Sequence, residues 1–138
     1  MINRMNLTKK VAVGFAIGVF SNFAWAQTLQ EGVASADSHK YAKAKQIFTD
    51  MIAKSPTAEN YFYLGNSYLT QFEPNFDLAQ ENFNKGLAID KKSKLNMIGL
   101  ASVKLGRGDK SSLMELQNIV KDSKDKDADV LYRAAEAL

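Results

Sequence analysis

Apolar residues recur at helical spacing from residue 27 onward, and no run of strict alternation is long enough to predict a strand. The breaks between apolar stretches contain residues that end helices. Ser55-Pro56 is one, because the residue before proline disfavours the α region. The pattern predicts an all-α protein whose short connections pack neighbouring helices as antiparallel pairs. The predicted helices span 28–37, 39–54, 58–71, 76–89, 93–106, 110–122 and 127–138.

Small residues recur at a fixed interval along these helices. Gly32, Gly65 and Gly99 are 33 and 34 residues apart, and Ala135 follows 36 residues later. Such a residue marks the point where two helices approach closely, once per structural unit. The interval therefore predicts an internal repeat of one helix pair.

The second of these units has its large and small residues in a characteristic order. It reads Tyr61-x2-Leu64-Gly65-x2-Tyr68 and then Ala79-x3-Phe83. This order resembles the tetratricopeptide repeat signature, with tyrosine at 61 where the family usually has tryptophan. In the preceding unit, Ala44-x3-Phe48 and Pro56 match the second helix and the terminal proline.

The resemblance implies a right-handed α-solenoid of stacked antiparallel helix pairs. A helix pair cannot cover its own apolar face, so each unit packs on its neighbours, and about three units are needed for stability. We expect one repeat domain over 27–138, with about three and a half tetratricopeptide units. They fall at approximately 27–57, 58–91, 92–126 and, incomplete, 127–138.

The last segment carries an apolar face where a solenoid normally ends in a polar one. Val130, Leu131 and Leu138 lie on that face. We expect either that the natural chain continues past Leu138 or that something covers the face. If the chain ends at Leu138, the expected cover is a second copy, in a homodimer through these three residues.

Residues 1–26 have the three parts of a secretory signal peptide. Basic residues in 1–10 precede an apolar run at 11–20, and small residues stand at Ala24 and Ala26 before Gln27. We expect cleavage before Gln27 and export to the periplasm or the outer membrane. The alternative is a leader retained as an anchor, which would be the only membrane association expected of the chain.

Charge and composition narrow the function classes. The leader holds three of the 18 Lys and Arg residues and no acid, so the remainder has 15 basic and 15 acidic residues. A neutral domain without a basic stripe gives no reason to expect nucleic acid. The absence of cysteine excludes disulfides and thiolate chemistry.

Candidate catalytic and metal-binding residues are few. His39 is the only histidine, and it is interpreted as a surface residue and not as a catalytic one. The alternating acids Asp125, Asp127 and Asp129 resemble a calcium loop, but Val130 occupies the position that needs glycine. Helix capping by these aspartates is the alternative that we favour. We expect no enzyme, no metal and no cofactor.

The resemblance also implies a concave groove lined by particular positions of the first helix in each unit. We therefore expect a non-enzymatic scaffold of the cell envelope that binds a partner peptide or helix in this groove. The alternative function is an accessory repeat region of a larger envelope protein, whose enzymatic, peptidoglycan-binding or assembly activity lies beyond Leu138. Phe62 and Leu69 have a second interpretation as packing residues. The candidate groove residues are Phe62, Asn66, Leu69, Thr70, Asn96, Leu100, Val103 and Lys104.

The leader yields a direct prediction about the mature protein. Cleavage after Ala26 gives a native chain that starts at Gln27, because small residues stand at both positions that a signal peptidase recognises. The intact mass of the protein from a cell-envelope fraction measures this. A mass that includes Met1 would show instead that the leader is a retained anchor.

Overall fold

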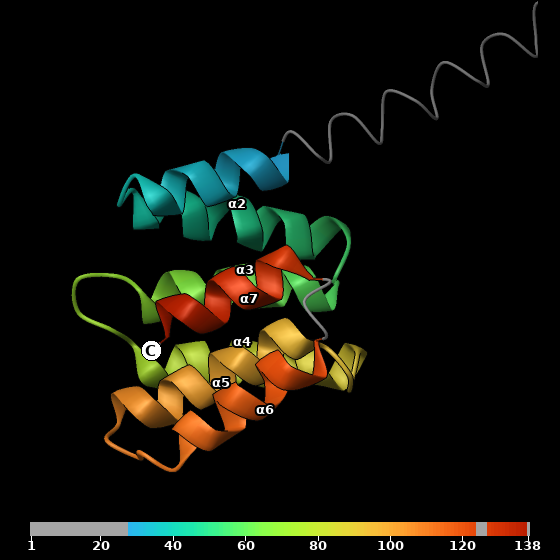
Figure 1. The fold of residues 1–138 in the computed structure, drawn as a ribbon. Helices are drawn as coiled ribbons and strands as arrows, with labels where there is room; N and C mark the ends of the chain where they lie inside the picture. The colour runs from blue at the N-terminus through green and yellow to red at the C-terminus, as the bar shows by residue number, and fades with distance from the viewer. Residues whose placement is uncertain (1–27, 124–126, 138) are drawn as a thin grey trace, which may run out of the picture.

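The computed structural model describes residues 28–123 and 127–137, and within these ranges it contains seven helices and no strand. The all-α prediction is therefore confirmed for the described residues. After a first helix at 28–37, the chain forms α2 (Tyr41–Lys54), α3 (Ala58–Leu69), α4 (Phe76–Ile89), α5 (Lys94–Gly106), α6 (Ser112–Asp122) and α7 (Ala128–Glu136). The helices follow one another down the molecule as far as α6, and α7 returns to lie in front of α3 (Figure 1).

Side-chain caps fix where several helices begin. Thr57, Asn75, Ser93 and Asp127 each accept a hydrogen bond from a backbone N–H in the first turn of the following helix. Such caps satisfy donors that have no partner inside the helix. The interpretation of the aspartates near residue 127 as helix caps is confirmed for Asp127, whose Oδ1 lies 3.3 Å from the N–H of Val130.

Helix ends differ from the predicted ones where a local feature stops the helix. His39 has a φ of 58°, in the left-handed region, so α2 begins at Tyr41 and not at 39. Asp109 accepts hydrogen bonds from the N–H and the hydroxyl of Ser111, and this turn delays α6 until Ser112. These bonds also lower the pKa of the Asp109 carboxyl.

An aromatic ring between two glycines joins three helices at the centre of the molecule. Phe83 of α4 is fully buried. A Cβ atom added to Gly65 of α3 would lie 2.7 Å from this ring, and one added to Gly99 of α5 would lie 2.5 Å from it. The glycine interval seen in the sequence therefore marks close helix contacts, as predicted. Gly32 of the first helix meets Phe48 of α2 in the same way.

The buried side chains form two clusters. The larger lies among α2, α3, α4 and α5 and includes Phe48, Phe62 and Phe83. The smaller joins α5, α6 and α7 through Ile98, Leu116 and Val130, among others. The apolar face of α7 therefore packs against its own chain, and Val130 and Ala134 are buried there.

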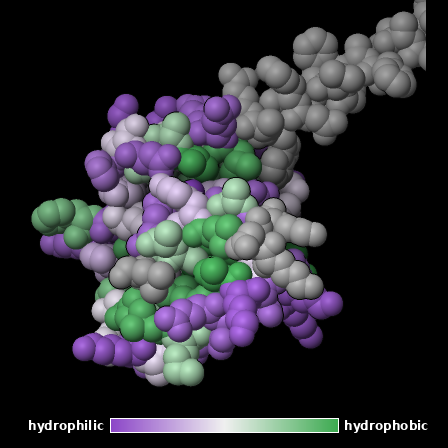
Figure 2. All heavy atoms as spheres, viewed as in Figure 1, coloured by the Kyte–Doolittle hydropathy of each residue, from purple (hydrophilic) through white to green (hydrophobic). Residues whose placement is uncertain are grey.

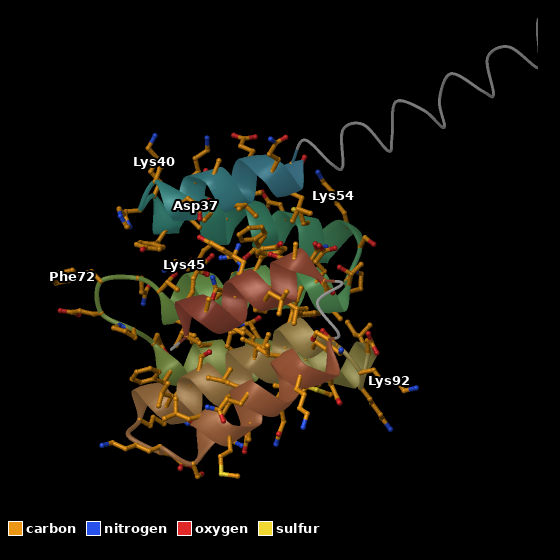
Figure 3. The ribbon with its side chains drawn as sticks, viewed as in Figure 1. Asp37, Lys40, Lys45, Lys54, Phe72 and Lys92 are labelled. Atoms are coloured by element: carbon orange, nitrogen blue, oxygen red, sulfur yellow. The ribbon has the colours of Figure 1, made fainter. Side chains whose placement is uncertain are left out.

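The connection between α3 and α4 projects from the body of the protein. Phe72 at its tip points away from the helices (Figure 3) and is 97% exposed. The aromatic residues around Phe62 are largely core, but Phe72 takes no part in it.

The Phe83 contact yields a test of the fold. Gly99→Ala should destabilise the protein by about 1–2 kcal/mol, because overpacking a full core outweighs the gain in helix propensity. In a Phe83→Leu background the smaller side chain leaves room, so the same Gly99→Ala change should become neutral or stabilising. Urea denaturation of the four proteins measures this coupling. Equal effects of Gly99→Ala in both backgrounds would contradict it.

Candidate partner-binding groove

The eight candidate groove residues separate into buried and accessible side chains. Phe62, Asn96 and Val103 are at most 1% exposed. They belong to the interior, and of the three only Phe62 lines either of the clefts described below. Asn66, Leu69 and Leu100 are partly exposed, and Thr70 and Lys104 are exposed. Lys104 forms an ion pair with Glu115 of α6 at 2.8 Å.

Phe62 and Val103 are buried because their helices pack closely at these positions. The Phe62 ring lies 5.9 Å from the ring of Phe83 and 5.2 Å from that of Tyr63, centroid to centroid. Of the two interpretations of Phe62, the packing role fits this geometry, since both rings belong to the adjacent helices α3 and α4.

Asn96 is buried between α5 and the start of α3, and its side chain aligns the two helices. Its amide Nδ2 donates to the backbone oxygen of Ala58 at 2.9 Å and to the hydroxyl of Ser93 at 2.8 Å. Asn60, the equivalent residue of α3, donates in the same way to the backbone oxygen of Ser55 at 2.9 Å. Buried polar groups are costly unless they are hydrogen-bonded, so a paired asparagine fixes one orientation of the two helices.

Two clefts flank the accessible groove residues. One, of about 390 Å³, lies among the first helix, α3 and α7, and Asp37, Tyr63 and Tyr132 are part of its lining. The other, of about 350 Å³, lies among α3, α5 and the end of α7, with Leu69 and Leu105 in its wall. Asn66, Thr70, Arg133 and Glu136 line both clefts.

The surface around α7 is mixed in character. Hydrophobic side chains emerge on this face in the region of α5 and α7, with polar residues over the surrounding helices (Figure 2). Such a surface suits a peptide that offers both apolar and hydrogen-bonding groups.

Arg133 of α7 is the most buried charge of this region, with 8% of its side chain exposed. Its Nη1 donates to Glu136 at 2.8 Å, and its Nε lies 3.6 Å from Asp129 Oδ1. The guanidinium also lies 5.6 Å from the centroid of the Tyr63 ring and 5.1 Å from that of Tyr132. Burial opposes the charged form, but the Glu136 hydrogen bond and the nearby acids raise the pKa of Arg133 above its ordinary value.

Tyr63 connects α7 to the core of α2 and α3. Its ring stacks on Phe48 at 5.4 Å, and its hydroxyl donates to Asp129 Oδ2 at 3.2 Å. Burial, followed by the charge of Asp129, raises the pKa of Tyr63 to about 12. Burial and the same Asp129 charge also raise the pKa of Glu59, one turn earlier on α3.

Sequence reasoning missed this set of contacts between α3 and α7. It singled out neither Tyr63 nor Arg133. The only signal was the spacing of Asp129 and Arg133, four residues apart, which puts them on one face of a helix. Nothing in that spacing names Tyr63 as their neighbour.

The remaining candidate residues are distributed as follows. His39 is exposed, and its Nδ1 lies 2.9 Å from the Tyr41 hydroxyl. Among the described residues no group of three acids or histidines is placed to hold a metal ion. Of the residues expected to form a dimer, Val130 is buried within its own chain, Leu131 is partly exposed, and Leu138 lies outside the described residues.

The leader and its cleavage residues Ala24, Ala26 and Gln27 also lie outside the described part of the chain. No helix within 28–123 or 127–137 has both the length and the apolar character needed to cross a membrane.

Comparison with known protein families and with characterised proteins gives no match for this chain. Any functional conclusion therefore rests on the groove itself.

The Tyr63 contact predicts how stability depends on pH. The folded chain holds the tyrosine proton up to pH about 12, whereas the unfolded chain releases it near pH 10. Stability from this group is thus complete below pH 10 and is lost as the pH rises toward 12. At pH 11 this loss is about 1.4 kcal/mol.

Tyr63→Phe lacks the ionisable hydroxyl and should lack this loss. Urea denaturation of both proteins at pH 8 and pH 11 measures the difference. At pH 8 the variant should already be less stable by about 1 kcal/mol, because the Asp129 hydrogen bond is absent. An identical drop in stability between the two pH values for both proteins would contradict the raised pKa.

Proposed function

We propose that the chain is an exported repeat protein of the tetratricopeptide type, built as an α-solenoid of stacked helix pairs. Two recurring contacts support this. A phenylalanine meets a glycine in the first helix and α2, and again in α3, α4 and α5. A buried asparagine at the third position of α3, and again of α5, holds a backbone oxygen of an earlier segment.

The proposed function is that of a non-enzymatic protein–protein interaction scaffold in the cell envelope. The partner is a peptide or helix that binds in the groove over α3 and α5. The observation that carries the proposal is that two clefts meet at Asn66 and Thr70, so one polar strip separates a polar cleft from an apolar one. Apolar and hydrogen-bonding groups side by side match the needs of a bound peptide backbone and its side chains.

The residue inventory supports a binding role over a catalytic one. The chain has one histidine and no cysteine, and within the described residues the His39 side chain forms a hydrogen bond with the Tyr41 hydroxyl. The leader pattern supports a location in the periplasm or at the outer membrane.

Site-specific photo-crosslinking in cells tests the proposal. A photoreactive residue at Thr70, which is exposed in the groove, should form an adduct with a partner protein in the envelope fraction. The same residue at Ala53 is the matched control, because Ala53 is exposed on α2 and lines neither cleft.

An adduct from Thr70 that is at least tenfold more abundant than from Ala53 would support the groove. Two results would contradict partner binding in the groove. One is equal adduct formation from Thr70 and Ala53, and the other is no adduct either from Thr70 or from a photoreactive residue placed at Leu69.

A further inference from the structure

Helix α7 departs from the packing of the other helices. It packs far less on α6 than α5 packs on α4, although both pairs are neighbours along the chain. Besides its contacts with α5 and α6, it reaches α3, where Asp129 accepts the Tyr63 hydroxyl and Arg133 covers the Tyr63 ring. In Figure 1 it crosses the face of the molecule between the first helix and α5.

In this position α7 forms one wall of both clefts. Arg133 and Glu136 line both clefts, opposite Asn66 and Thr70 of α3. The two clefts are therefore the parts of one groove that α7 leaves open. The chain carries its own helix where a partner would bind.

The fit of α7 in the groove is incomplete. The Nε of Arg133 is buried and has no hydrogen-bond partner. Burial, followed by the charge of Asp129, raises the pKa of Glu59, so the two acids repel each other when both are ionised. Val130 and Ala134 are its only fully buried apolar side chains, and Tyr132 is half-exposed. α7 therefore buries only small apolar side chains, leaves the Arg133 Nε without a hydrogen bond and holds Asp129 near a like charge. These three features favour a helix that another helix can replace.

We propose that α7 is a built-in occupant of the groove, and that the partner is an amphipathic helix of the same chemistry that replaces it. This inference rests on the proposed function and specifies its partner. A bound segment of the same chain shows directly which side chains the groove accepts. A partner must then compete with α7. Its apparent affinity is its intrinsic affinity multiplied by the fraction of time that α7 has left the groove.

The contacts of α7 define the chemistry of the partner helix. It carries small apolar residues four positions apart, as at Val130 and Ala134. It also carries an arginine that stacks on Tyr63, with an acid four residues before that arginine to accept the tyrosine hydroxyl. This pattern distinguishes the partner from an extended peptide, which cannot present these four groups on one side of a helix.

Two adjacent alanines provide a matched pair of variants in the full chain. Ala134 is buried against α5 and α6, whereas Ala135 is exposed on the same helix. Ala134→Asp places a charge in the apolar contact and should release α7. Ala135→Asp adds the same charge at the surface and should leave α7 in place.

The probe is a fluorescent synthetic peptide with the sequence of residues 127–137, and binding is measured by anisotropy. The peptide should bind Ala134→Asp at least tenfold more tightly than it binds the wild type or Ala135→Asp. A peptide with Val130→Asp should bind none of them. Far-UV circular dichroism verifies that each protein retains its helices.

A second variant tests the same inference even if Ala134→Asp does not fold. A Gly–Ser insert of about 20 residues within 124–126 leaves α7 and the groove unchanged but dilutes the tethered helix. It should raise the affinity for the peptide several-fold, because effective concentration falls roughly as the −3/2 power of tether length.

The outcomes separate this inference from the proposed function. Equal peptide affinity for all the folded proteins, or no binding to any of them, would overturn the inference. If the Thr70 adduct forms in that case, the groove binds a partner of other chemistry and the proposed function stands. Tight peptide binding to the released variants supports α7 as a displaceable occupant, even where no adduct forms and the scaffold function fails.

Discussion

The contact on which the architecture depends is the Phe83 ring held between the backbones of Gly65 and Gly99. Neither glycine has a Cβ, so α3 and α5 both approach α4 closely enough for one side chain to fill the space between them. Protein interiors tolerate few voids and little overlap, so this single ring fixes the spacing of three helices. The surface of α3 and α5 that faces α7 is a consequence of that spacing.

A second constraint is polar and orients α5 against α3. Asn96 holds the backbone of Ala58, and Gly86 of α4 leaves room for it, because a Cβ there would clash with the Asn96 side chain. The Oδ1 atoms of Asn60 and Asn96 have no partner within the described residues, which is a cost. An apolar residue at either position would avoid that cost, but it would lose the bond that orients one helix pair against the next.

The groove and α7 are connected through these constraints. Tyr63 stacks on Phe48 in the core, so its hydroxyl is held at a fixed point above α3. Asp129 and Arg133 meet it there, so α7 contacts α3 as well as α5 and α6. Under the proposed function, a groove that holds one of the chain's own helices would combine recognition with control of access, because every partner would compete with the tethered segment.

The sequence by itself determined the helices, their order and the close contacts at Gly65 and Gly99, because periodicity, caps and glycine spacing act over short distances along the chain. It also predicted Asn66 and Thr70 as groove residues, and both line the two clefts. It could not decide that Phe62, Asn96 and Val103 are buried, or that α7 lies over α3. Those outcomes depend on contacts between residues far apart in the chain, such as Tyr63 with Asp129, and only the packed structure brings such residues together.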